Sequence, residues 1–127
     1  IHLRLHIGVN SMEINAMPLP LDTAPFMLFD QQGGGYTMVP LRFIAEAFGA
    51  QVSWDGEQRT VGIALHGSSF TLRIGQTIAG SPAAVMLRDD RTFVPLRYVM
   101  ETLGAEVYWQ REGQRIDIYY QPPAGSR

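Results

Sequence analysis

The first seven residues alternate strictly between apolar and polar side chains. The apolar positions are Ile1, Leu3, Leu5 and Ile7. A period of two is typical of a half-buried β-strand. We therefore predict an N-terminal strand, which pairs either within its own sheet or with the sheet edge of a second molecule.

Two later stretches change to the helical period, with apolar residues at i, i+3, i+4 and i+7. These stripes are Leu41, Ile44, Ala45 and Phe48, and Leu96, Val99, Met100 and Leu103. Each stripe follows a proline, Pro40 or Pro95, whose missing N–H is not needed in a first helical turn. Each ends at a glycine, Gly49 or Gly104, where a left-handed C-terminal cap is expected. The pattern predicts two short helices.

Each predicted helix is followed by another alternating stretch. Its apolar members are Ala50, Val52 and Trp54 in one case and Ala105, Val107 and Trp109 in the other. The parity predicts half-buried strands with both tryptophans in the core. Asp55-Gly56 is a hairpin signal before a returning strand, and the turn at 110–114 has the same place after Trp109.

These elements belong to an internal repeat. The stretch 36–54 recurs as 91–109, and the offset from Pro40 to Pro95 is 95 − 40 = 55. We predict an α+β fold of two repeats, each an antiparallel β-sheet curled over one α-helix with a C-terminal β-hairpin. Because one such unit is too small for its own core, the repeats are expected to share one.

The predicted boundaries are 1–66 for the first repeat, 67–120 for the second and 121–127 for a linker-like tail. The first repeat contains a longer loop at 10–35, with short strands at Met12–Ala16 and Phe26–Phe29. The shorter second version has strands at Ile78–Gly80 and Ala83–Leu87.

Composition narrows the function classes. A net charge of −2 and a pI near 5.9 argue against a nucleic-acid surface. No apolar run approaches the roughly 20 residues of a membrane helix, so membrane insertion is not expected. The chain has no cysteine, which excludes disulfides and thiolate chemistry.

The repeated motif resembles the copper amine oxidase N-terminal-like domain, also called the stalk domain. The first copy matches at Val39-Pro-Leu-Arg42, Gly49-Ala50 and Trp54-Asp55. The second matches at Val94-Pro-Leu-Arg97, Gly104-Ala105 and Trp109, and departs with Gln110 where the pattern often has Asp. The resemblance runs from Ile7 to Ile118. It implies an appendage, separate from the catalytic domain that holds copper, on a secreted or cell-surface protein of Gram-positive bacteria.

Candidate chemistry is sparse in this sequence. His2 and His6 share a strand face but lie roughly 13 Å apart at ~3.3 Å per residue, too far to ligate one ion. His66 precedes a turn, and Ser68-Ser69 lacks the context of a nucleophile. We therefore expect no catalytic residue, no metal site and no cofactor.

Two pairs of opposite charge occur at i, i+4 on the predicted helices. They are Arg42 with Glu46 and Arg97 with Glu101. Together with the prolines they form a helix-start motif at Pro40, Arg42, Glu46, Pro95, Arg97 and Glu101. A cation is disfavoured in a first helical turn, so each arginine is expected to have a specific partner. We predict a structural role, with ligand binding as the alternative.

Tyr108 and Tyr119 occupy the polar parity of the last hairpin, so they are expected to form an exposed aromatic patch. The corresponding positions of the first copy are Ser53 and Ala64. Such a patch suits a sugar or a protein partner. The alternative is an aromatic pair that only stabilises the sheet.

The sequence predicts a non-catalytic extracellular structural module of a bacterial surface protein. It would act as a spacer, or as a self-assembling building block of a filament or array joined through the strand at Ile1–Ile7. The alternative is a module that binds cell-wall or other polysaccharide, and the third is an enzyme accessory domain. The expected partner is accordingly the chain itself or a glycan.

Overall fold

The structure, a computed structural model, describes residues 1–77 and 83–124, and the backbone but not the side chain of Met100. The fold is α+β, with short helices and antiparallel sheets. The strands are β1 (His2–His6), β2 (Ser11–Ile14), β3 (Met17–Pro20), β4 (Phe26–Phe29), β5 (Gly35–Pro40), β6 (Gln51–Asp55), β7 (Thr60–Leu65), β8 (Ser68–Arg73), β9 (Met86–Arg88), β10 (Arg91–Pro95), β11 (Glu106–Gln110) and β12 (Arg115–Tyr119). The helices are α1 (Leu41–Ala47), α2 (Leu96–Glu101) and the 3-10 turn η1 (Glu112–Gln114).

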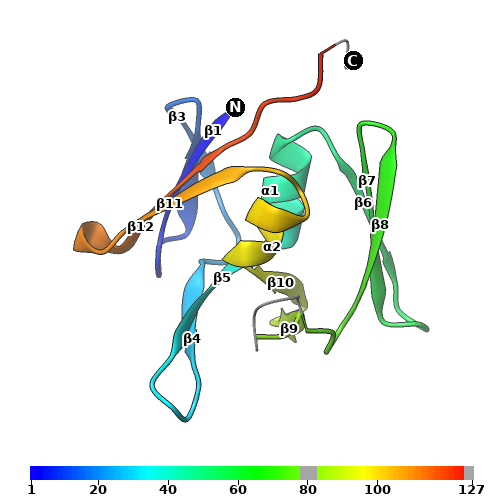
Figure 1. Ribbon diagram of the computed structural model, residues 1–127, viewed down its shortest axis with the longest axis horizontal. Helices are drawn as coiled ribbons and strands as arrows, with labels where there is room; N and C mark the ends of the chain where they lie inside the picture. Colours follow the sequence, from blue (N-terminus) through cyan, green and yellow to red (C-terminus); the bar gives the residue numbers. More distant parts are fainter. Residues whose placement is uncertain (78–82, 125–127) are drawn as a thin grey trace.

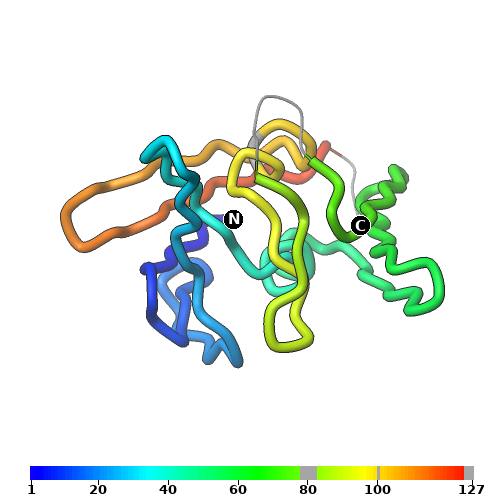
Figure 2. The backbone as a smooth tube through the Cα atoms, turned by 90° about the horizontal axis from the view of Figure 1, so that it is seen from below, coloured from blue at the N-terminus to red at the C-terminus, as the bar shows by residue number. Residues whose placement is uncertain are grey.

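The strands form three sheets. Sheet A has the order β11-β12-β1-β2-β3, sheet B has the order β4-β5-β10-β9, and sheet C has the order β6-β7-β8. Sheets A and C lie on opposite sides of the molecule, with α1 and α2 between them (Figure 1). The view in Figure 2 shows the same separation of the β11–β12 hairpin from sheet C.

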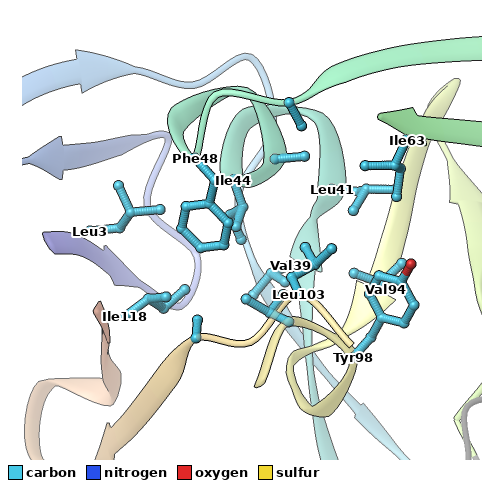
Figure 3. Packing of buried hydrophobic residues seen from close by; sticks show 14 of the residues in the cluster. Leu3, Val39, Leu41, Ile44, Phe48, Ile63, Val94, Tyr98, Leu103 and Ile118 are labelled. Carbon is cyan, nitrogen blue, oxygen red and sulfur yellow. The ribbon is translucent and has the colours of Figure 1, made fainter. Parts of the chain in front are cut away.

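The main core fills the space between these layers. Leu3 and Ile118 of sheet A approach Phe48 at the end of α1, whereas Leu41 approaches Ile63 of sheet C (Figure 3). All five side chains are buried. A smaller cluster of Met38, Ala83 and Phe93 is separate from the main core. The helices are too short to be stable alone, so packing on both sides is what maintains them.

The helix boundaries follow the predicted signals. Pro40 ends β5 and is the N-cap of α1, and Pro95 does the same for β10 and α2. After α1, Gly49 has φ +98° and the Ala50 N–H donates to the Ala45 carbonyl at 2.9 Å. This is the Schellman arrangement, which needs a left-handed residue and therefore favours glycine.

The strand pairing differs from the prediction of one sheet for each repeat. β5 pairs with β10 in sheet B, and β1 pairs with β12 in sheet A, so both sheets contain strands from both halves of the chain. β5 has only β4 on its other side, and β10 has only β9. Each of the two strands therefore has one edge that its own neighbour does not cover, and this edge lies in the interior. When β5 and β10 pair with each other, the N–H and C=O groups along these edges are hydrogen-bonded.

The predicted loop at 10–35 contains more strand than expected. The strand predicted at Met12–Ala16 ends at Ile14, and Asn15 and Ala16 form a two-residue turn with positive φ at both positions. The following strand β3 was missed because it contains Pro18 and Pro20. Prolines are tolerated there because β3 is an edge strand that needs donors on one side only.

Two other short strands can be compared with the prediction. β4 covers Phe26–Phe29 as expected. The strand predicted at Ala83–Leu87 is instead an isolated bridge from Ala84 to Thr77 followed by β9. The strand predicted at Ile78–Gly80 lies outside the described residues.

The prediction that both tryptophans are buried was wrong. Trp54 is 44% exposed and Trp109 is 41% exposed. Burial falls from Ala50, which is buried just before β6, through half-buried Val52 to exposed Trp54. The same decline runs through β11. The predicted parity is correct, but only the residue before each strand and the valine within it contact the core.

Candidate functional site

The outward face of sheet A combines aromatic, acidic and basic side chains. Tyr108 lies opposite Asp117, and Asp117 lies opposite Arg4 on the next strand. Tyr119 lies opposite Glu106 on one side and His2 on the other. Residues directly opposite in an antiparallel pair share a face. We call this surface the tyrosine face, which comprises His2, Arg4, Glu106, Tyr108, Gln110, Arg115, Asp117 and Tyr119.

The tyrosine rings are exposed and ordered by contacts with each other. Tyr108 is 52% exposed and Tyr119 is 43% exposed. Their centroids are 5.8 Å apart in an edge-to-face arrangement, and the His2 ring stacks on Tyr119 at 4.4 Å. The Tyr108 hydroxyl donates to Glu106 at 3.1 Å, and this hydrogen bond raises the pKa of Tyr108. The sequence prediction of an exposed aromatic pair here agrees with the placement of both residues.

Asp117 is the buried polar residue beneath this surface. Its Oδ1 lies 2.7 Å from His2 Nε2 and accepts from Arg4 Nε at 2.9 Å, and its Oδ2 accepts from Arg115 Nε at 2.9 Å. Burial by itself would raise the pKa of Asp117, but the hydrogen bonds from His2 and Arg4 and the two guanidinium charges outweigh it, so the pKa is lowered. Asp117 is therefore a carboxylate that fixes the position of three neighbouring side chains.

Sequence reasoning did not identify this carboxylate network. The residues come from β1 and β12, which are more than a hundred positions apart, and no local pattern places Asp117 beside Arg4. The alternation of β1 predicted that His2 and Arg4 share a face. Which strand pairs with β1, and so places its side chains beside His2 and Arg4, is decided only by the tertiary fold.

The tyrosine face is hollowed into a shallow groove of about 460 Å³. Its lining consists of Arg4, Glu106, Tyr108, Gln110, Arg115, Asp117 and Tyr119. Both arginines use Nε for Asp117, and their terminal Nη groups make no hydrogen bond within the part of the chain that the structure describes. The groove thus presents aromatic ring surface beside hydrogen-bond donors that are already positioned.

A second concavity, the Trp54 cleft, lies between α1, the β6–β7 hairpin and the β9–β10 turn. Its volume is about 470 Å³, and Arg42, Phe43, Trp54, Asp90 and Arg91 are among the residues that line it. Arg91 is already engaged, because its guanidinium donates to Asp22 at 2.7 Å and to the Asp89 carbonyl at 2.7 Å. The cleft was not predicted, since Trp54 was expected in the core.

The helix-start charge pairs lie at the surface. Arg42 and Glu46 are 4.0 Å apart and Arg97 and Glu101 are 3.6 Å apart, with all four side chains about half exposed. Exposed pairs of this kind contribute little, typically about 0.3–0.5 kcal/mol. The two pairs are not brought together into one site, and a structural role for them stays a prediction.

The N-terminal strand lies inside sheet A, between β12 and β2. Leu3 and Leu5 are fully buried, Ile7 is half-buried and Ile1 is at the edge of exposure. Of the two pairings left open by the sequence, this structure has the one within the chain's own sheet. Pairing with another molecule requires β1 to leave that position.

The histidines do not meet one another. His2 contacts Asp117, and His66 Nε2 lies 3.2 Å from the Phe48 carbonyl oxygen. Among residues 1–77 and 83–124, no three side chains of the His, Cys, Asp and Glu types gather where they could hold a metal ion. Within the same residues, the helices are all too short or too polar to span a bilayer.

The tandem motif and this fold agree with one family. The copper amine oxidase N-terminal domain matches the chain at residues 1–63 and 74–122. The chain belongs to this family. The resemblance drawn from the repeated Val-Pro-Leu-Arg motif is thereby confirmed. No curated protein and no solved structure matches the chain. As a member of this family, the domain is an accessory module and not the catalytic domain of an oxidase.

Proposed function

We propose that this accessory domain is a polysaccharide-binding module of an extracellular or cell-surface protein, and that the tyrosine face is its binding surface. A comparison of the two hairpins supports the proposal. β6–β7 and β11–β12 both follow a helix and both are antiparallel. At the positions of Tyr108 and Tyr119, 55 residues earlier, the first hairpin has Ser53 and Ala64. Because the first hairpin forms without an aromatic residue at either of these two positions, the tyrosines are not needed to build a hairpin.

The comparison rests on a second inference, that the halves are two copies of one structural unit. The succession of strand, helix and two paired strands occurs as β5, α1, β6 and β7 and again as β10, α2, β11 and β12. The boundaries at 1–66 and 67–120 remain predictions. If the halves are two such copies, a residue type that is present in one hairpin and absent at the equivalent position of the other is not required by the shared fold.

The chemistry of the groove suits a chain of sugars. The faces of pyranose rings carry C–H groups that pack on exposed aromatic rings, whereas their hydroxyl groups need polar partners at the rim. The groove provides Tyr108 and Tyr119 for the first contact. The terminal Nη groups of Arg4 and Arg115 supply donors for the second, and Asp117 holds both guanidinium groups in place.

The contact between Ile1 and Tyr120 favours a binding module over a spacer. The Ile1 amino group donates to the Tyr120 carbonyl at 2.8 Å, and the Tyr120 N–H donates back to Ile1 at 2.8 Å. Figure 1 shows β1 beside β12, so the first and last strands of the domain are neighbours. A domain whose ends are adjacent adds little length between its neighbours, but it projects its body outward.

The test is retention of the purified protein on insoluble polysaccharides, with bacterial peptidoglycan, cellulose and chitin as separate probes. We expect retention on at least one, and a loss of about tenfold or more in affinity for Tyr119→Ala and for Tyr108→Ala, as for an aromatic hot spot. Trp54→Ala is the matched control, because Trp54 is equally exposed and lies outside the groove.

The outcomes separate the candidate surfaces. If Trp54→Ala abolishes retention and the tyrosine variants do not, the binding surface is the Trp54 cleft and the assignment to the tyrosine face is wrong. If the wild-type protein is retained on none of the three polysaccharides, the proposal fails. The module is then better explained as the structural unit that the sequence predicted.

A further inference from the structure

We propose that this chain associates with a second copy of itself by exchanging residues 1–21, so that β1 of each molecule pairs with β12 of the other. The partner is thus an identical chain and the interface is the one already present within the monomer. This inference is independent of polysaccharide binding.

The exchanged segment is a compact unit of its own. β1 pairs with β2 and β2 pairs with β3, and both connections are short. Sheet A ends at β3, so the segment is joined to the rest of that sheet through the β1–β12 pair. This pair has five registered positions, from His2–Tyr119 to His6–Arg115. Apolar side chains of the segment, including Leu3 and Met12, are buried in the common core.

The first strands of the two predicted repeats complete each other's hairpins. β8, at the start of the second repeat, lies beside β7 of the first, and β1 of the first lies beside β12 of the second. The β7–β8 contact is fixed by the two-residue turn at His66-Gly67. The β1–β12 contact has no such local connection, since the two strands are more than a hundred residues apart in the sequence. The β11–β12 hairpin therefore requires a strand but does not determine which molecule supplies it.

The connection between the segment and β4 would act as the hinge. It consists of residues 22–25 and includes Pro25, whose carbonyl accepts from the Gly8 N–H at 2.9 Å. Extended, four residues span roughly 13–14 Å. Opening this turn would release the segment without breaking β1–β2–β3. Because the exchanged dimer repeats every contact of the monomer, protein concentration controls the balance between the two forms.

The unpaired edge of β3 limits the exchange to dimers. β3 carries Pro18 and Pro20, which cannot donate to a further strand. A second strand addition at that edge is therefore disfavoured. The closed arrangement with two reciprocal β1–β12 pairs satisfies both acceptor hairpins.

The test uses engineered cysteines, because the natural chain has none. His6 and Arg115 are directly opposite. They form a non-hydrogen-bonded pair, since the neighbouring Ile7 N–H donates to Gln114, and the short Cα separation at such pairs suits a disulfide. His6→Cys and Arg115→Cys are made in separate full-length chains, mixed at roughly millimolar concentration and oxidised. We expect a disulfide between the two variants, identified by its intact mass.

Two controls make the result decisive. His6→Cys mixed with Gln58→Cys, in the exposed β6–β7 loop, measures random collision. We expect the first mixture to give about tenfold more mixed disulfide than this control. Equal yields would overturn the proposal. The double variant His6→Cys/Arg115→Cys in one dilute chain should form an intramolecular disulfide. If it does not, the β1–β12 register on which the proposal rests is wrong.

Discussion

Val39 of β5 lies directly opposite Val94 of β10, and both side chains are fully buried. They are separated by 94 − 39 = 55 positions, the same offset that relates Pro40 to Pro95. On either side of this pair, Met38 faces Pro95 and Pro40 faces Phe93. The pairing is therefore symmetric about one point in sheet B. The two copies of the sequence motif meet there and place one helix on each side of it.

This symmetry predicts equal consequences for equivalent substitutions. Val39→Ala and Val94→Ala each remove two buried methylene equivalents, and we expect each to lower the free energy of unfolding by roughly 2 kcal/mol. Denaturant unfolding of both variants and of the double variant measures the costs and their coupling. Because the residues share one site, the double variant should depart from additivity. Costs that differ by several-fold would show that the two sides of the pair are packed differently.

Asp117 should control the acid stability of sheet A. Its lowered pKa means that the folded state holds this proton less tightly than the unfolded state. The resulting stabilisation is complete above the ordinary pKa and is lost as the pH falls below about 4, through the folded-state pKa. We expect Asp117→Asn to cost about 1–3 kcal/mol at neutral pH, since it leaves charged donors poorly satisfied.

The measurement for Asp117 is the free energy of unfolding as a function of pH. The Asn variant should show a shallower decline on acidification than the wild-type protein. Asp89→Asn, at an exposed position of the β9–β10 turn, is the matched control. An unchanged pH profile in Asp117→Asn would show that this carboxylate does not carry the acid sensitivity.

Tyr98 offers a stabilising substitution. Its hydroxyl is buried and makes no hydrogen bond within the described residues, and burial raises the pKa of Tyr98 to about 12. The equivalent residue of the first copy is Phe43, because 98 − 55 = 43. We expect Tyr98→Phe to raise the free energy of unfolding by roughly 1 kcal/mol, since it removes an unsatisfied polar group. A loss of stability in thermal unfolding would mean that the hydroxyl has a partner in solution.

The two helix-ending glycines should resist substitution. Gly49 has φ +98° and Gly104 has φ +82°, in the left-handed region. A Cβ on Gly49 would meet His66 at an ordinary distance of 3.6 Å, so the expected cost comes from the backbone. We predict a loss of about 1–2 kcal/mol for each Gly→Ala variant. Gly56→Ala is the control, because Gly56 is not among the glycines with positive φ. A cost at Gly56 equal to that at Gly49 would contradict the explanation.

The sequence by itself determined the local elements of this protein. Proline before an apolar stripe and glycine after it placed both helices, because these residues restrict the backbone wherever they occur. Alternation identified β1 and the outward positions of Tyr108 and Tyr119. The repeated Val-Pro-Leu-Arg motif identified the family. Each of these signals lies within a short window of the chain and needs no knowledge of distant residues.

Only the tertiary structure decided which strands pair and which surfaces are left open. The sequence did not show that β1 would lie beside β12, because the backbone N–H and C=O groups are the same in every strand and do not specify which strand they pair with. For the same reason it missed the edge strand β3, where prolines are harmless on the unpaired side. The burial of Trp54 depended on how far β6 extends beyond the core, and the network around Asp117 depended on two strands from opposite ends of the chain. Local chemistry fixes a residue's conformation, whereas its neighbours are fixed by the packing of the whole molecule.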